Sequence, residues 1–240
     1  NKLSTELLLS DQIYLRDAYL KKIEPLLTDV KKIFISESKR QDWNMDGEVI
    51  IPGIDVDKYG GYTGENRMVL RVGNLIKERD LMMGFSAGEA ILSNLPSITL
   101  GVNPDIKGSR LSRGFKDLIS NYRSQRVFLN TTQENYEDGY NLSLLEAMAV
   151  GMPVISTFNK TSPVIDGQNG FISNNINYLT QSAIRLLDDK NMAKSMGEKA
   201  KETIRNQFSK SNFINLWNKC IHDAILEFLE NTGVSMSNEP

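Results

Sequence analysis

The sequence predicts an α/β fold in which a Rossmann-like parallel sheet carries helices on both of its faces. From Met68 onward, short apolar segments of strand length alternate with segments whose apolar residues recur at helical spacing. Strands separated by helices favour parallel pairing, because a crossover helix returns the chain to the same end of the sheet. With 240 residues, 40% of them hydrophobic, the chain has ample apolar content to bury such a core.

The first part of the chain predicts the end of a separate domain. A helix is expected over 10–28, a strand over 32–38 and an extended segment over 49–54. We place the domain boundary between Ile50 and Arg67, where Pro52 and several glycines interrupt the apolar pattern. The chain starts with asparagine, so we expect a fragment or processed product in which most of the N-terminal domain is missing.

The rest of the chain predicts the parallel sheet, some further helices and a tail. Residues 1–55 are assigned to the remnant and linker, 56–230 to the Rossmann-like domain and 231–240 to a polar tail. Strands are expected at 68–72, 97–102, 126–131, 153–157 and 170–173. Helices are expected at 82–93, 112–122, 142–150, 178–187, 192–208 and 213–229.

Composition excludes several classes of protein. The net charge is −2 with no basic stripe, which argues against nucleic acid as a partner. No apolar stretch approaches the roughly 20 residues that span a bilayer, so we predict no transmembrane segment and a cytoplasmic location. Cys220 is the single cysteine, which leaves no intrachain disulfide and no cysteine-based zinc cluster.

The loop after the strand at 126–131 is the richest in chemistry. It places Glu137 and Asp138 ahead of Gly139, directly before the strongly helical segment 142–150. The free N–H groups and positive dipole end at a helix start bind phosphate or sugar oxygens, and a glycine lets the backbone come close. Glu146, one turn inside the helix, can reach a vicinal diol such as a ribose. Two carboxylates beside such a helix start suit a sugar nucleotide.

The segment DGYNLSLLEAMAVGMPVIS, at 138–156, resembles the signature of retaining GT-B glycosyltransferases, the group 1 family with the E-x7-E motif. This resemblance implies the C-terminal, donor-binding half of a GT-B fold. The family's second glutamate falls on Glu146 and implies that this residue binds the ribose. The first falls on Asp138, so Asp138 and the adjacent Glu137 are both candidates for contact with the donor sugar. The resemblance further implies that backbone amides bind the sugar or diphosphate, at Tyr140, Asn141 and Leu142.

A second segment, VGNLIKER at 72–79, resembles the family's first strand and loop, which face the diphosphate. Gly73 matches, Asn74 stands where the family has arginine, and Arg79 falls on the family's lysine. We therefore predict Arg79 as the phosphate-binding cation, with Lys77 in reserve, because a guanidinium binds phosphate oxygens in a bidentate way.

The resemblance implies a hexosyltransferase that moves a hexose from a nucleoside diphosphate sugar to an acceptor hydroxyl. It implies retention of configuration, no essential metal and no cofactor beyond the sugar-nucleotide substrate. The expected acceptor is a glycan or a lipid-linked glycan in bacterial-type glycan or glycolipid synthesis, which adds the inner membrane face as an alternative peripheral location. The isolated chain would depend on its missing N-terminal domain or on a partner subunit.

Two alternative functions remain open from the sequence. One is a non-catalytic nucleotide-sugar-binding subunit that needs a partner. The other is a sugar-nucleotide epimerase of the same fold, which requires a histidine in its cleft, whereas His222 lies in the terminal helical segment. Asp55-Val-Asp57 imitates a metal-binding motif, but it lies in the predicted linker and we predict no metal site.

Overall fold

The structure, a computed structural model, describes residues 9–28, 30–136 and 139–232. The chain divides into two compact units: unit 1 comprises Asn1–Pro52 with Ser211–Pro240, and unit 2 comprises Gly53–Lys210. Along the chain, the first boundary between the units lies after Pro52, inside the predicted range between Ile50 and Arg67, and the second lies after Lys210. The assignment of 1–55, 56–230 and 231–240 to parts of a larger protein stays a prediction.

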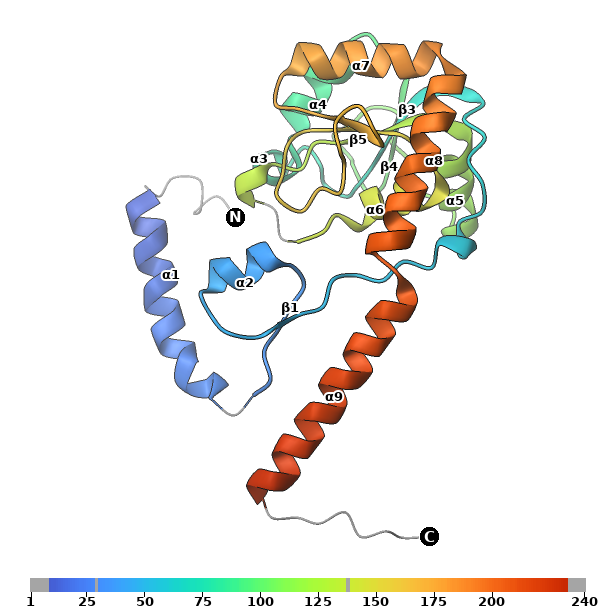
Figure 1. Cartoon of the computed structure of the whole chain (residues 1–240). Coiled ribbons are helices and arrows are strands. Elements are labelled where there is room, and N and C mark those ends of the chain that lie inside the picture. Colours follow the sequence, from blue (N-terminus) through green and yellow to red (C-terminus); the bar gives the residue numbers. More distant parts are fainter. Residues whose placement is uncertain (1–8, 29, 137–138, 233–240) are drawn as a thin grey trace. The chain divides into compact units, whose positions relative to one another are not determined.

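Unit 2 is built on a five-stranded parallel sheet (Figure 1). Its strand order is β4-β3-β5-β6-β7, and every neighbouring pair is parallel. The strands are β3 (Asn66–Val72), β4 (Ser97–Leu100), β5 (Gln125–Asn130), β6 (Val154–Ser156) and β7 (Gly170–Ile172). The predicted fold class is therefore confirmed, and each predicted strand of this sheet is present.

Helices cover both faces of the sheet. Helix α4 (Phe85–Leu92) and helix α7 (Ile176–Asp188) pack together on one face, where their apolar side chains join those of β3, β5 and β6 in one buried cluster. Helices α5 (Phe115–Ser124) and α6 (Leu142–Val150) pack on the other side of the strands, as right-handed crossovers require (Figure 1). Helix α8 (Lys190–Gln207) lies along α6, and a short helix η3 (Val56–Lys58) precedes β3.

One predicted helix of unit 2 is broken in two. The expected helix over 82–93 appears as α3 (Asp80–Met83) and α4, with Gly84 between them at a φ of +60°. A side chain at this position would overlap the carbonyl oxygen of Thr131, so only glycine allows the close approach. Another short helix, η4 (Glu134–Tyr136), follows β5.

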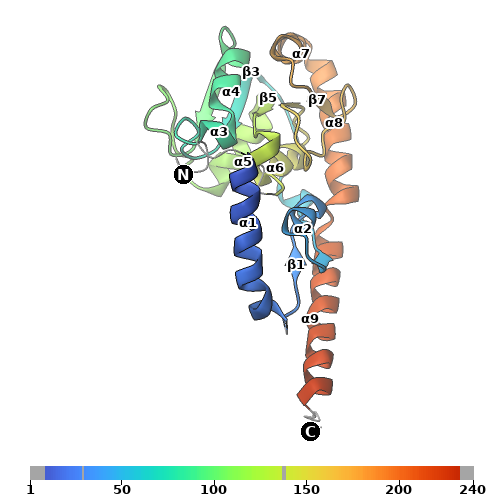
Figure 2. The same ribbon diagram turned by 90° about the vertical axis from the view of Figure 1, so that its left-hand side faces the viewer.

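Unit 1 contains the remaining elements: α1 (Leu9–Ile23), η2 (Glu24–Leu27), β1 (Ile33–Phe34), α2 (Glu37–Trp43), β2 (Glu48–Val49) and all but the first residue of α9 (Lys210–Thr232). The predicted strand over 32–38 is wrong in its second half, where α2 begins beside β1 (Figure 2). The Ser36 hydroxyl oxygen accepts the Lys39 N–H at 3.2 Å and caps the new helix. The strand was predicted from the apolar residues of this segment, and such a pattern does not reveal a helix cap.

Within the part of the chain that the structure describes, none of the helices combines the length and apolar character that a membrane span requires.

Candidate functional site

The sheet order defines one place where ligands of this architecture bind. The chain leaves β3 for β4 on one side and then crosses to β5 on the other, so the strand order reverses beside β3. In open parallel sheets, ligands bind at the carboxyl ends of the strands that flank such a reversal. The segment at 73–79 follows β3, and the segment at 131–141 follows β5. The fold thus brings together the two segments that the sequence singled out separately.

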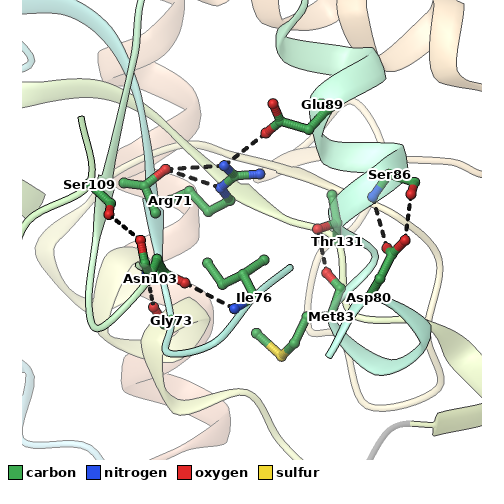
Figure 3. Close-up of polar contacts among 11 residues, drawn as sticks. Arg71, Gly73, Ile76, Asp80, Met83, Ser86, Glu89, Asn103, Ser109 and Thr131 are labelled. Carbon is green, nitrogen blue, oxygen red and sulfur yellow. Dashed lines mark hydrogen bonds and ion pairs between the residues drawn. The ribbon is translucent and has the colours of Figure 1, made fainter. Parts of the chain in front are cut away.

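The loop after β3 is held by a buried asparagine (Figure 3). Asn103, only 4% exposed, accepts the Ile76 N–H at 2.9 Å through Oδ1. Its Nδ2 donates to the Gly73 carbonyl oxygen at 2.8 Å. Two backbone groups of one loop are thereby satisfied by a single side chain, which fixes the path of the chain as it leaves the strand.

Asn74 also joins the loop after β3 to the loop after β4. Its side-chain oxygen accepts the Val102 N–H at 2.8 Å. The next residue, Leu75, has a φ of +51°, a left-handed backbone that is strained for a residue with a side chain. At least one side-chain atom of Asn74 therefore holds the loop, and the predicted donor contact of Asn74 stays a prediction.

Both predicted phosphate-binding cations are exposed at this loop. Arg79 immediately precedes α3, and its Nη2 lies 2.9 Å from the sulfur of Met82. Lys77 is also exposed, two residues earlier. Exposed cations beside a backbone held by buried hydrogen bonds can reach an incoming anion without first breaking a buried ion pair.

Replacing Asn103 by alanine is expected to lower the free energy of unfolding by about 1–2 kcal/mol, because Ile76 N–H and the Gly73 carbonyl lose their shared partner. Urea denaturation followed by circular dichroism measures this change in the free energy of unfolding. Ser109→Ala is the matched control, since this hydroxyl makes one hydrogen bond to the Asn103 carbonyl oxygen, at 2.7 Å. Equal losses of unfolding free energy in the two variants would contradict the idea that the Asn103 side chain fixes the loop after β3.

The start of α6 is shaped by Gly139 and Asn141. Gly139 has a φ of +124°, and its carbonyl oxygen accepts the Thr161 hydroxyl at 3.0 Å. Asn141 caps the helix: its Oδ1 accepts the Leu144 N–H at 3.2 Å, while its Nδ2 donates to Asn130 Oδ1 at 3.0 Å. The Asn141 side chain thus ties the helix start to the end of β5.

The backbone N–H groups around this cap are open. Among the residues that the structure describes, none accepts a hydrogen bond from the N–H of Tyr140, Asn141 or Leu142. The Tyr140 ring packs against Phe208 with centroids 5.0 Å apart, and burial raises the pKa of its hydroxyl. Consecutive free N–H groups at a helix start can bind an anion, and the predicted role of these three amides stays a prediction.

Glu137 and Asp138, the predicted contacts of the donor sugar, lie outside the described residues. Their roles stay predictions.

Glu146 is half-buried on α6 and held by two tyrosines. The Tyr59 hydroxyl donates to Oε1 at 3.3 Å, and the Tyr122 hydroxyl donates to Oε2 at 3.2 Å. Burial raises the pKa of the Glu146 carboxyl, and the two hydroxyl donors oppose that rise. No local pattern indicates this contact, since the tyrosines lie 87 and 24 residues away from Glu146 along the chain.

A buried arginine beneath the loop is not among the residues predicted for the site. Arg71, 4% exposed on β3, bonds Thr99 Oγ1 at 3.2 Å through Nε and Glu89 Oε1 at 2.9 Å through Nη2 (Figure 3). Its Nη1 has no hydrogen-bond partner within the described chain. Arg71 could have been noticed as a single cation inside the apolar strand segment 68–72. Asn103 could have been noticed as a polar residue directly after the apolar strand segment 97–102.

No metal centre emerges from the described residues, where no group of three or more His, Cys, Asp or Glu side chains is arranged to hold an ion. Asp55 pairs with Lys210 at 2.9 Å, and this hydrogen bond lowers the pKa of the carboxyl. The His222 side chain is 71% exposed beside Asp223, in unit 1. Cys220 is buried in unit 1.

Parts of the chain are similar to known glycosyltransferases. Residues 87–189 match the family model described as Glycosyl transferases group 1. The chain is 33% identical over 78 residues to a trehalose synthase of Pyrococcus horikoshii, covering 32% of this chain and 19% of that protein. It is 29% identical over 93 residues to the N-acetyl-alpha-D-glucosaminyl L-malate synthase of Bacillus anthracis, covering 37% and 24%. The matched part therefore spans about a fifth of these relatives' length.

Solved structures share the fold. A mutant of TarM from S. aureus, crystallised with UDP among other ligands, superposes with a TM-score of 0.64 at 18% identity over 79% of this chain and 43% of that one. HepE of Anabaena in complex with UDP and glucose gives a TM-score of 0.69 at 14% identity, covering 85% and 66%.

Proposed function

Since residues 87–189 belong to the group 1 glycosyltransferases and the chain has the fold of part of a GT-B enzyme, we propose that it binds a nucleoside diphosphate sugar through unit 2. The complete enzyme would transfer the hexose to an acceptor hydroxyl, with retention of configuration and without a metal or further cofactor. The proposed setting is bacterial-type glycan or glycolipid synthesis, in the cytoplasm or at the inner membrane face.

One observation supports this proposal above the others. The loop with Lys77 and Arg79 follows β3, the open N–H groups at 140–142 follow β5, and the strand order reverses between these two strands. Cations and helix-start N–H groups at one reversal point are complementary to a diphosphate.

Each group then has a role that follows from its chemistry. Arg79, with Lys77, would neutralise the diphosphate, whose departure from the sugar is the charge-developing step. The N–H groups at 140–142 and the α6 dipole would hold its oxygens. Glu146 would accept the ribose hydroxyls, and Glu137 or Asp138 would contact the donor sugar. In such chemistry the protein chiefly positions the donor and stabilises the leaving group.

The acceptor side lies beyond unit 2 in this proposal. Because the matched part spans about a fifth of the curated relatives, a glycan or lipid-linked acceptor would be bound by further residues of a longer protein or by a partner subunit. UDP accompanies both TarM and HepE in their crystals, which makes UDP the first nucleotide to test.

Calorimetric titration of the whole chain with UDP, GDP, ADP and dTDP tests the proposal. One nucleotide is expected to bind saturably, and Glu146→Gln is expected to weaken it about tenfold, through loss of a charged acceptor for the ribose hydroxyls. Glu198→Gln, an exposed change on α8, is the control and should leave affinity unchanged. Absence of binding by all four nucleotides, or equal affinities in both variants, would argue against this donor site.

A further inference from the structure

We propose that Tyr59 and Tyr122 are positioning residues, which orient the Glu146 carboxylate so that its remaining lone pairs receive the two ribose hydroxyls of the donor nucleotide. This inference rests on the proposed function and extends it to recognition of the ribose.

The hydroxyls of Tyr59 and Tyr122 donate hydrogen bonds to different oxygens of the Glu146 carboxylate. Tyr59 donates to Oε1 and Tyr122 to Oε2, at 3.3 and 3.2 Å. One such donor would leave the carboxylate free to rotate about the bond that carries it, whereas two donors from different elements fix the plane. Tyr59 follows η3 and Tyr122 lies in α5, so three separate elements meet at this group.

Both rings are anchored in the core and cannot follow the carboxylate if it turns. Tyr122 is fully buried and packs on Phe128 of β5 with ring centroids 5.9 Å apart. Tyr59 is 8% exposed and meets the ring of Phe115 at 6.0 Å. Rigid donors pre-organise an acceptor, and ordering it before the ligand arrives removes that entropic penalty from binding.

The carboxylate keeps capacity for a ligand after both contacts are made. A carboxylate offers about four lone-pair sites, and the two tyrosines use two of them. Glu146 is only half-buried, while its neighbours Leu144, Leu145 and Ala147 are almost completely buried. One acceptor site on each oxygen, about the spacing of two vicinal hydroxyls, therefore remains for a diol.

The tyrosines stay donors over the whole range in which the nucleotide would bind. Burial and the nearby Glu146 charge raise the pKa of Tyr59 to about 12 and that of Tyr122 well above its ordinary value. Neither hydroxyl ionises near neutral pH, so neither repels the carboxylate it orients.

The test compares ribose with a sugar that lacks the diol. Tyr59→Phe, Tyr122→Phe and the double variant are titrated with UDP, GDP and ADP and with the 2′,3′-dideoxy form of each. Tyr62→Phe is the matched control, because the Tyr62 hydroxyl donates to the Arg126 carbonyl oxygen at 2.7 Å and not to Glu146. Each single variant should weaken the ribonucleotide about 3- to 10-fold and change the dideoxynucleotide less than twofold.

A second readout needs no ligand. The carboxyl pKa of Glu146, followed by NMR titration, should rise in both tyrosine variants and stay constant in Tyr62→Phe, because each lost hydroxyl removes a donor to the ionised form. Equal weakening of ribo- and dideoxynucleotides would overturn the inference and leave only a structural role. Absence of ribonucleotide binding by the unchanged chain would refute the proposed function, and with it this inference.

Discussion

Replacing Gly101 by alanine is expected to lower the free energy of unfolding of unit 2 by about 3–5 kcal/mol and to abolish nucleotide binding. Gly101 has a φ of +126°, a backbone that a residue with a side chain adopts only under strain of about 1–3 kcal/mol. An added Cβ would also overlap the Gly73 carbonyl oxygen, so the loop after β3 must move. Overpacking against a fixed backbone adds about 1–3 kcal/mol.

The control separates backbone strain from the clash. Gly108 also has a positive φ, +80°, but nothing lies within 4 Å of the Cβ that Gly108→Ala would add, so a loss of only about 1 kcal/mol is expected. Urea denaturation by circular dichroism gives the stabilities, and calorimetry gives the nucleotide affinities. If Gly101→Ala were no worse than Gly108→Ala, the close contact between the two loops would not exist in solution.

Local signals explain how much of the site could be predicted. Helix α6 has the predicted bounds, because Asn141 can cap its start and Gly151, with a φ of +97°, ends it. The strand-to-helix loops were also identifiable, since the apolar period changes at each one. These features depend only on residues that are close together in the sequence, so they can be recognised without knowing the fold.

The contacts that complete the site depend on register and could not be predicted. Asn103 reaches Gly73 because Val72 is paired with Leu100 in the parallel strands β3 and β4. A shift of one residue would turn the asparagine side chain to the other face. The tyrosines on Glu146 likewise come from elements whose packing no local pattern fixes.

Two local predictions failed for related reasons. The segment 32–38 carries apolar residues typical of a strand, but the Ser36 cap starts α2 within it. The segment 82–93 has continuous apolar spacing, but Gly84 lies so close to Thr131, the residue after β5, that the helix is broken there. In both cases a single residue with a tertiary or capping role outweighed the period of the apolar pattern.

Removal of Glu89 from the Arg71–Glu89 pair is expected to cost more stability than replacement of Arg71. Glu89→Ala is expected to destabilise unit 2 by about 3 kcal/mol, because it leaves the 95% buried side chain of Arg71 with Thr99 as its main partner. This figure is at the low end for a broken buried pair, since the Glu89 side chain is 51% exposed. Nη1 already lacks a hydrogen-bond partner among the described residues, so the guanidinium would keep only Thr99 and the Phe85 ring, whose centroid lies 5.6 Å away.

Arg71→Met, by contrast, removes the cation and fills its space with an apolar side chain. The free energy of unfolding is expected to stay within about 1 kcal/mol of the original value, because the cost of burying the charge disappears together with the ion pair. The double variant should therefore be more stable than Glu89→Ala alone, a coupling that urea denaturation of all four proteins measures. Additive losses would mean that the pair makes no net contact, whereas the predicted rescue would identify Arg71 as a buried charge that the fold retains directly beneath the loop after β3.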